Sequence, residues 1–225
     1  MRKLIKSIPF LGLLSVKIYR KIKRGPRFIS SGNYWEERYN NGGDSGAGSY
    51  NQLAKFKANI INDFVQEKMI DDTLELGCGD GNQLKYLKFN KYKGMDVSPS
   101  AIKRCEELYS NDPTKTFEVI GNSSNAKYDL VLSLDVIYHL VEDDVYERYM
   151  NKIFDSAKKY VIIYSSNYNE KNFGLRSEHV RHRKFSSWIE RNAPEFLLVN
   201  KVLNDFQYNG DGINTSLADF YFYEK

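Results

Sequence analysis

The chain has 225 residues, of which 41% are hydrophobic and 28% are charged, and its net charge at pH 7 is +4. This length and composition predict one folded domain with appendages and exclude general disorder, because 17 Tyr and 13 Phe are available for a core. The two cysteines, Cys78 and Cys105, lack metal-ligand spacing and indicate a reducing compartment.

Residues 1–27 form a basic and apolar N-terminal segment. Every charged residue in it is Lys or Arg, whereas residues 28–225 are acidic on balance. Its longest uncharged stretch, residues 7–16, has about half the length of a membrane-spanning helix, and no signal-peptide cleavage site follows. Two interpretations stay open: an interfacial anchor on anionic lipid, or a helix packed on the domain or on a partner. Nucleic acid is not expected, because aromatic residues do not alternate with the basic ones.

Residues 28–50 are rich in Gly, Ser and Asn and are predicted to form a flexible lid or linker, interrupted by the aromatic string NYWEERY. The main domain is expected over residues 51–225. It begins with an amphipathic helix over residues 50–69, in which Leu53, Phe56 and Ile60 recur at helical spacing.

From there the chain alternates between strand and helix patterns. Strands are predicted at 72–77, 92–97, 115–121, 128–135 and 159–166, and helices at 82–89, 98–109 and 142–157. Ser98 is placed to cap the second of these helices, with Pro99 in its first turn. After a short helix near 186–192, two last strands, 196–206 and 216–225, are expected to pair antiparallel. The pattern predicts a three-layer α/β sandwich around a seven-stranded, mostly parallel sheet with an antiparallel C-terminal strand.

The string ELGCGDG follows the first predicted strand and presents a bare, acidic turn. Its glycines, Gly77, Gly79 and Gly81, do not match the dinucleotide fingerprint, whose third glycine would fall at Asn82, and the Lys and Ser/Thr of a phosphate-binding loop are missing. Glu75 and Asp80 would repel a pyrophosphate but attract an ammonium and a sulfonium. S-adenosylmethionine carries both cations, so the turn favours this ligand.

A second carboxylate supports a nucleoside ligand. Asp96 ends the second predicted strand, 19 residues after Gly77, and this is the usual place for an acid that accepts hydrogen bonds from ribose hydroxyls.

The strings ELGCGDG, GMDVS and YDLVLSLDVIYHL together resemble the successive motifs of class I S-adenosylmethionine-dependent methyltransferases, in order over residues 34–225. The resemblance implies a Rossmann-like fold and S-adenosyl-L-methionine as cofactor. It also implies that the glycine turn shapes the methionine side, that Asp96 holds the ribose, and that NYWEERY covers the cofactor. The expected cofactor-binding residues are Trp35, Arg38, Glu75, Gly77, Cys78, Gly79, Asp80, Gly81, Asp96, Val97, Ser98, Asn122 and Ser133.

Candidate catalytic residues follow the fourth predicted strand. Asp135 ends that strand beside the expected sulfonium position, and His139 comes just beyond, where it is either a general base for a hydroxyl or a residue that closes the cofactor pocket. His182 is a further candidate base. Glu142, Asp143 and Asp144 open a helix and are expected to complement its dipole, so no metal site is predicted.

The string SEHVRHRKF, residues 177–185, gathers imidazole and guanidinium groups after the fifth predicted strand. It is interpreted as an acceptor site for a phosphate or an acidic glycan group, or alternatively as a solvated basic loop. The expected substrate-binding residues are Tyr50, Tyr138, His179, Arg181 and Arg183.

The strings NYWEERY, SLDVIYHL and HVRHRKF also resemble methyltransferase domains that accompany glycosyltransferases in surface-polysaccharide pathways. This resemblance implies a sugar or glycan acceptor and a cytoplasmic protein, peripheral at the inner membrane face. A small-molecule or protein methyltransferase, a non-catalytic S-adenosylmethionine-binding module and a membrane-associated scaffold remain alternatives. The oligomeric state stays open.

Overall fold

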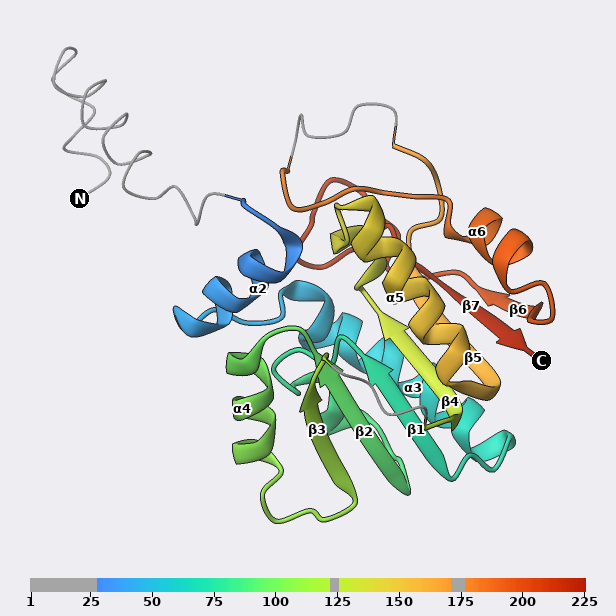
Figure 1. The fold of residues 1–225 in the computed structure, drawn as a ribbon, viewed down its shortest axis with the longest axis horizontal. Helices are drawn as coiled ribbons and strands as arrows, with labels where there is room; N and C mark the ends of the chain where they lie inside the picture. The colour runs from blue at the N-terminus through green and yellow to red at the C-terminus, as the bar shows by residue number, and fades with distance from the viewer. Residues whose placement is uncertain (1–27, 122–125, 171–176) are drawn as a thin grey trace, which may run out of the picture.

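The computed structural model describes residues 28–121, 126–170 and 177–225 (Figure 1). The basic N-terminal segment, residues 1–27, and the expected cofactor-binding residue Asn122 therefore lie outside the described residues. None of the helices in the described ranges combines the length and the apolar character that crossing a bilayer requires.

One seven-stranded sheet forms the middle of the molecule, with the strand order β3-β2-β1-β4-β5-β7-β6. Only β7 runs against its neighbours: it pairs antiparallel with β5 and with β6, and the other pairings are parallel. The predicted α/β fold with an antiparallel C-terminal strand is confirmed. The strands are β1 (Asp72–Leu76), β2 (Lys91–Asp96), β3 (Lys115–Val119), β4 (Tyr128–Leu134), β5 (Ala157–Ser165), β6 (Leu197–Val202) and β7 (Asp219–Glu224).

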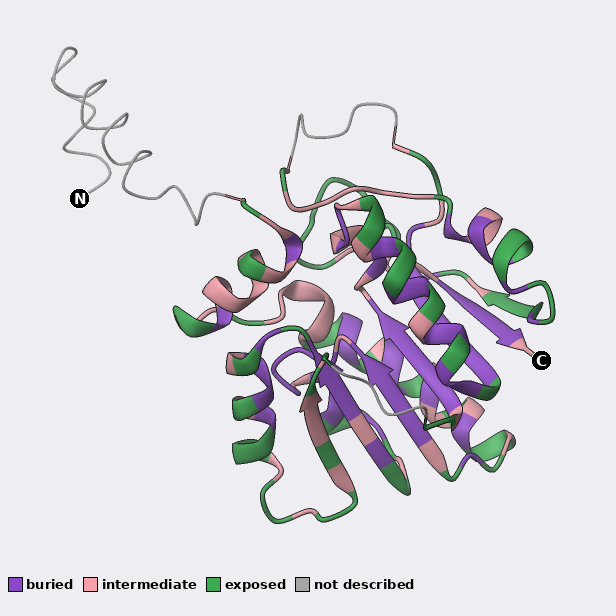
Figure 2. Ribbon diagram, viewed as in Figure 1, coloured by how far each residue is buried: buried purple, intermediate pink, exposed green. Residues whose placement is uncertain are grey.

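Helices cover both faces of the sheet, and the central strands are buried on both sides (Figure 2). The core divides into two clusters, one between the sheet and α3 and α4, the other between the sheet and α5 and α6. Burial on two faces explains why four of the five residues in LVLSL are apolar, instead of every second one. The helices are α2 (Ser31–Asn40), α3 (Asn51–Glu67), α4 (Pro99–Leu108), α5 (Asp143–Ser156) and α6 (Phe185–Asn192).

The strand order reverses between β1 and β4, because β2 and β3 lie to one side of β1 while β4 and β5 lie to the other. In such sheets a crevice opens at this point beyond the carboxyl ends of the strands, and ligands bind there. The chain segments that follow β1, β2 and β4 all meet at this edge.

The helix predicted over residues 82–89 is wrong. The segment makes a single 3₁₀ turn, η3 (Gln83–Tyr86), and Leu87 has returned to extended backbone. Leu84 and Leu87 are both buried, and their spacing of three suits a 3₁₀ turn as well as an α-helix, so the apolar pattern could not separate the two.

Two local predictions concern helix starts. Ser98 caps α4 by accepting a hydrogen bond from the amide of Ala101, and Pro99 occupies the first turn, as expected. Within the segment predicted as a lid, residues 31–40 form α2, whose cap Ser30 accepts from the amide of Asn33. A short 3₁₀ turn, η2 (Ala47–Ser49), precedes α3.

Candidate active site

The glycine turn after β1 requires glycine at three alternate positions. Gly77, Gly79 and Gly81 have φ of 84°, 58° and 75°, in the left-handed region that other residues avoid. A Cβ at Gly77 would overlap Val136, and one at Gly79 would overlap Ser45. The backbone conformation therefore requires glycine at these positions. Close packing of Val136 and Ser45 against the turn gives Gly77 and Gly79 a second reason to lack a side chain.

A cavity of about 600 Å³ opens between this turn, the ends of β2 and β4, and helix α2. Of the predicted cofactor-binding residues, the turn supplies Glu75, Gly77, Cys78 and Gly79 to its wall. The end of β2 supplies Asp96 and Val97, and α2 supplies Trp35. The predicted residues absent from the described lining are Arg38, Asp80, Gly81, Ser98 and Ser133.

Asp96 presents a carboxylate to the cavity from the end of β2. Its Oδ2 accepts from the Gly79 amide at 2.9 Å and its Oδ1 from the Ser98 amide at 2.9 Å. Burial raises the pKa of Asp96 to about 6, against the lowering effect of these amides. The two bonds fix the plane of the carboxylate, and its remaining lone pairs can accept from hydroxyls.

Glu75 lies beneath the turn and is fully buried. The Tyr92 hydroxyl donates to its Oε2 at 2.6 Å, and burial raises the pKa of Glu75 to about 7. Its side chain lines the cavity, so a cationic group bound there would favour the ionised carboxylate.

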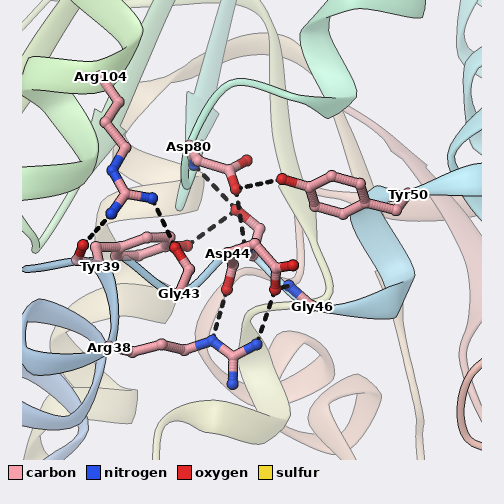
Figure 3. A network of polar contacts seen from close by, with 9 residues as sticks. Arg38, Tyr39, Gly43, Asp44, Gly46, Tyr50, Asp80 and Arg104 are labelled. Carbon is pink, nitrogen blue, oxygen red and sulfur yellow. Dashed lines mark hydrogen bonds and ion pairs between the residues drawn. The ribbon is translucent and has the colours of Figure 1, made fainter. Parts of the chain in front are cut away.

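Asp80 joins the glycine turn to the loop that follows α2. Its Oδ2 accepts from the Ser45 amide at 3.0 Å and from the Tyr50 hydroxyl at 2.8 Å, while the Asp80 amide donates to Ser45 Oγ at 2.9 Å (Figure 3). These bonds tie residues 44–50 onto the glycine turn. Tyr50, which was predicted to bind substrate, takes part in these contacts through its hydroxyl group.

Arg38 belongs to the same network. Its Nε donates to the Asp44 carbonyl and its Nη2 pairs with Asp44 Oδ1 at 2.9 Å, while Arg104 donates to the carbonyls of Tyr39 and Gly43 (Figure 3). The guanidinium groups thus hold the loop that follows α2.

Two carboxylates fix helix α2 to its neighbours, one at the first residue of the helix and one at its middle. Ser31 donates from its amide and hydroxyl to the two carboxylate oxygens of Glu142, at 2.8 and 2.6 Å. Glu36 accepts from the hydroxyls of Ser98 and Ser100 at the start of α4. Ser98 therefore supports α2 and is not part of the described cavity wall.

Ser133 is fully buried below the cavity. The Tyr149 hydroxyl donates to the Leu76 carbonyl at 2.8 Å, which leaves Ser133 Oγ to donate to Tyr149 at 2.8 Å. This chain of bonds joins β4, α5 and β1 under the glycine turn.

A second recess of about 360 Å³ adjoins the cavity and shares Trp35, Ser45, Asp135 and His139 with it. Segments far apart in the sequence meet there: α2 with its following loop, the first turn of α3, the chain that follows β4, the chain that follows β5, and the connection between β6 and β7. Its other described lining residues are Tyr34, Arg38, Gly46, Ala47, Gly48, Leu53, Tyr138, His179, His182, Tyr208, Gly212, Thr215, Ser216, Leu217 and Ala218.

The imidazoles of the recess are stacked and held by neighbours. Tyr34 and His179 lie parallel with centroids 4.2 Å apart, and Trp35 meets His139 edge to face at 4.9 Å. His139 Nδ1 lies 3.1 Å from the His179 carbonyl, which can only accept. Nδ1 is therefore the protonated nitrogen, and Nε2 carries the lone pair. Burial lowers the pKa of His139 to about 4.

His182 also lines the recess. Its Nδ1 is 2.6 Å from Ser166 Oγ, its ring stacks on Tyr168, and burial lowers the pKa of His182. Asp135, at φ 60°, accepts from the Tyr138 hydroxyl at 2.8 Å and pairs with Lys57 at 2.7 Å.

The arginines predicted to bind substrate are not brought to the recess. Arg181 and Arg183 both pair with Asp143 Oδ1, at 3.0 and 2.9 Å, and both donate to the Val141 carbonyl. Asp144 pairs with Arg148. No group of three or more His, Cys, Asp and Glu within the described ranges could hold a metal ion.

Sequence reasoning missed several residues that line the cavity, among them Ser45, Ser49, Lys57 and Gln83. Lys57 and Gln83 lie on a helix and a turn whose apolar pattern pointed only to core packing. The serines of the SGAGS string were visible, but nothing in the string says that it folds onto the glycine turn.

The acceptors of the cavity wall fit a nucleoside that carries a cationic group. The Asp96 carboxylate can accept from ribose hydroxyls, and the buried Glu75 carboxylate lines the same wall, where a cation would favour its ionised form.

Residues 74–160 match the family model described as methyltransferase domain. The 235L protein of Invertebrate iridescent virus 6, whose description as a methyltransferase is itself provisional, is 24% identical over 122 residues. The match covers 51% of this chain and 46% of that protein, so the chain spans about half the length of this relative.

Among solved structures, the N-methyltransferase NodS of Bradyrhizobium japonicum WM9 with S-adenosyl-L-homocysteine has a TM-score of 0.67 and 15% identity, over 87% of this chain and 98% of NodS. Magnesium protoporphyrin IX methyltransferase (ChlM) of Synechocystis PCC 6803 with bound SAM has a TM-score of 0.61 and 11% identity, over 88% of this chain and 98% of ChlM. The fold is that of class I S-adenosylmethionine-dependent methyltransferases. With the matching domain over residues 74–160 it supports a methyltransferase.

Proposed function

We propose that this protein transfers a methyl group from S-adenosylmethionine to a hydroxyl oxygen of a sugar or glycan that binds in the recess. The observation that carries the proposal is that Asp135 and His139 line both the cavity and the recess. A methyl donor and an acceptor would come together at these two residues. When bound, the cofactor supplies an activated methyl group, so the chain mainly has to orient the acceptor and exclude water.

The charge balance of the recess supports an uncharged acceptor. The fully charged groups among its described lining residues are Arg38 and Asp135, and each is in an ion pair, with Asp44 and Lys57 respectively. Burial lowers the pKa of the lining imidazoles, which keeps them neutral at pH 7.

The composition of the recess supports a ring that carries hydroxyls. Aromatic rings line the recess at Tyr34 and Trp35, and hydroxyl groups line it at Thr215 and Ser216. With Arg181 and Arg183 engaged by Asp143, a neutral sugar fits this lining better than a glycan phosphate does.

His139 is the residue we assign as general base. Its tautomer, set by the His179 carbonyl, leaves Nε2 free to take a proton. A hydroxyl oxygen becomes strongly acidic as it acquires a methyl group, so an imidazole of low pKa still suffices. Asp135 and His182 remain the other candidates for this role, and both line the recess.

The test is methyl transfer from labelled donor to a panel of sugars, glycans, phenols and amines, the amines being included because NodS is described as an N-methyltransferase. His139→Ala is expected to lower kcat about 100-fold or more while affinity for S-adenosylhomocysteine changes only a few-fold, the usual size of a general-base effect. Lys184→Ala, an exposed change in the same loop cluster, is the control. Turnover of amines alone, or full activity in His139→Ala, would contradict the proposal.

For residues 1–27 we propose binding to an anionic membrane surface at the cytoplasmic face, where lipid-linked sugars would be presented. The support is their basic and apolar composition.

A further inference from the structure

The connection between β6 and β7, residues 203–218, carries apolar side chains that the described part of the fold leaves uncovered. Four of its large apolar residues are exposed: Leu203, Tyr208, Ile213 and Leu217. The Tyr208 amide donates to the Ser216 carbonyl at 3.1 Å, so the two arms of the connection lie side by side. Exposed apolar side chains that gather in one place on a folded domain mark a surface that another segment can cover.

Two of these side chains stand at the mouth of the recess. Tyr208 and Leu217 line the recess, yet they are 45% and 46% exposed, so each also faces solvent. Helix α2 contributes Tyr34 to the same recess, and Figure 1 shows the connection between β6 and β7 extending beyond the end of the sheet toward α2. A partner that covered the exposed apolar side chains would therefore also cover the entrance to the recess.

The charge of the connection distinguishes between kinds of partner. Residues 203–218 contain Asp205 and Asp211, both exposed, and no Lys or Arg. These carboxylates would repel an anionic lipid surface and attract a basic segment. The surface therefore fits a partner that is both apolar and basic.

Residues 1–27 have this composition and are tethered beside the surface. They contain nine Lys and Arg residues and no Asp or Glu, with apolar residues between the charges. The described chain begins at Phe28, whose ring centroid lies 6.5 Å from that of Tyr34 in the recess wall. An extended chain spans about 3.3–3.6 Å per residue, so a few residues reach across a recess of about 360 Å³. A short tether gives an effective concentration of about 1 mM, at which even weak docking is populated.

We propose that residues 1–27 dock on the connection between β6 and β7, against its exposed apolar side chains and the carboxylates of Asp205 and Asp211. Docked there, the segment covers the mouth of the recess. An anionic membrane competes for the same Lys and Arg side chains, so binding to lipid uncovers the recess at the surface where an acceptor is presented. This regulation of acceptor entry rests on the proposed function, whereas the docking itself does not.

Amide hydrogen exchange in the full chain tests the docking. Amides of residues 203–218 are expected to exchange about threefold to tenfold more slowly in the full chain than in the chain that begins at Phe28, as for a dissociation constant of about 0.1–0.5 mM at an effective concentration of about 1 mM. In the full chain, Ile213→Lys should speed the exchange of residues 1–27, because it places a like charge and removes apolar contact. Met69→Lys, an exposed change before the amino end of β1, is the matched control.

Equal exchange of residues 203–218 in the two chains, or unchanged exchange of residues 1–27 in Ile213→Lys, would overturn the docking. Protection that rises with protein concentration would also overturn it, because the segment would then lie on a second copy. Phosphatidylserine vesicles should remove the protection and phosphatidylcholine vesicles should not, and protection that persists on phosphatidylserine would overturn the competition with lipid. These measurements involve no methyl transfer, so failure of the docking is distinguishable from failure of the proposed function.

Discussion

At the scale of single residues, the cavity depends on buried carboxyl groups whose ionisation is costly without a ligand. Burial raises the pKa of Asp96 to about 6 and that of Glu75 to about 7. Hydrogen-bond donors from a nucleoside and a nearby cation both favour the ionised forms. Ligand binding and ionisation are therefore linked at these two positions.

Asp96→Ala should weaken binding of S-adenosylhomocysteine by roughly 1.5 to 3 kcal/mol, because the carboxylate accepts hydrogen bonds as a charged group. Calorimetry at pH 7.5 measures the change. Val119→Ala, an exposed apolar residue on the neighbouring strand, serves as the comparison. Wild-type affinity in Asp96→Ala would remove this residue from the cofactor site.

Glu75 makes the stability of the ligand-free protein depend on pH. Its folded-state pKa of about 7 lies above the unfolded value, so its favourable contribution is complete below the unfolded pKa and is lost as pH rises through about 7. Between pH 8 and pH 5 the free energy of unfolding should rise by up to a few kcal/mol more in the wild type than in Glu75→Gln. Denaturant titrations at the two pH values test this, and identical pH dependence in the two proteins would contradict it.

At the scale of elements, the region above the glycine turn is assembled by carboxylates that reach between segments. Glu142 holds Ser31, Glu36 holds Ser98 and Ser100, and Asp80 holds residues 44–50. Each of these bonds joins two segments of the chain. Helix α2 and its following loop therefore close the cavity only when Glu142, the start of α4 and the glycine turn are all in place.

Gly79→Ala tests this assembly. The new methyl group would overlap Ser45 and approach Tyr39, in a backbone conformation of φ 58° that disfavours alanine. We expect a loss of about 1–3 kcal/mol in stability, together with faster amide exchange over residues 31–50. Gly212→Ala, where a methyl group meets nothing within 4 Å, should change neither. Unchanged amide exchange over residues 31–50 in Gly79→Ala would contradict the role of the glycine turn in holding this segment.

At the scale of the whole molecule, the described chain begins beside the recess. Phe28 lies 6.5 Å, between ring centroids, from Tyr34, and Tyr34 lines the recess. A segment that bound lipid immediately before Phe28 would therefore keep the acceptor side of the protein near the membrane surface.

Deleting residues 1–27, which carry nine Lys and Arg residues, should abolish binding to anionic vesicles and leave affinity for S-adenosylhomocysteine intact, because the residues described in the cavity wall all come from later in the chain. Vesicle sedimentation with phosphatidylserine measures the first effect, and phosphatidylcholine vesicles are the control. Equal sedimentation of the full and shortened chains would refute the anchor.

The sequence by itself determined the features that depend on neighbours along the chain. The glycine spacing at 77, 79 and 81, the capping of α4 by Ser98 and the alternation of strand and helix all follow from local backbone geometry and periodicity. The position of Asp96 at the end of β2 follows equally, since a parallel sheet brings the carboxyl ends of its strands to one edge.

Only the tertiary structure decided which polar side chains enter the cavity. Asp80 and Arg181 carry charges that a ligand site could use, but Asp80 accepts from the Ser45 amide and Arg181 donates to the Val141 carbonyl. Lys57, by contrast, lines the cavity although the apolar pattern of its helix indicated only core packing. The physical reason is that hydrogen bonds and ion pairs depend on distance in space. The partner of Lys57 is 78 residues away in the chain, and no local pattern records such a contact.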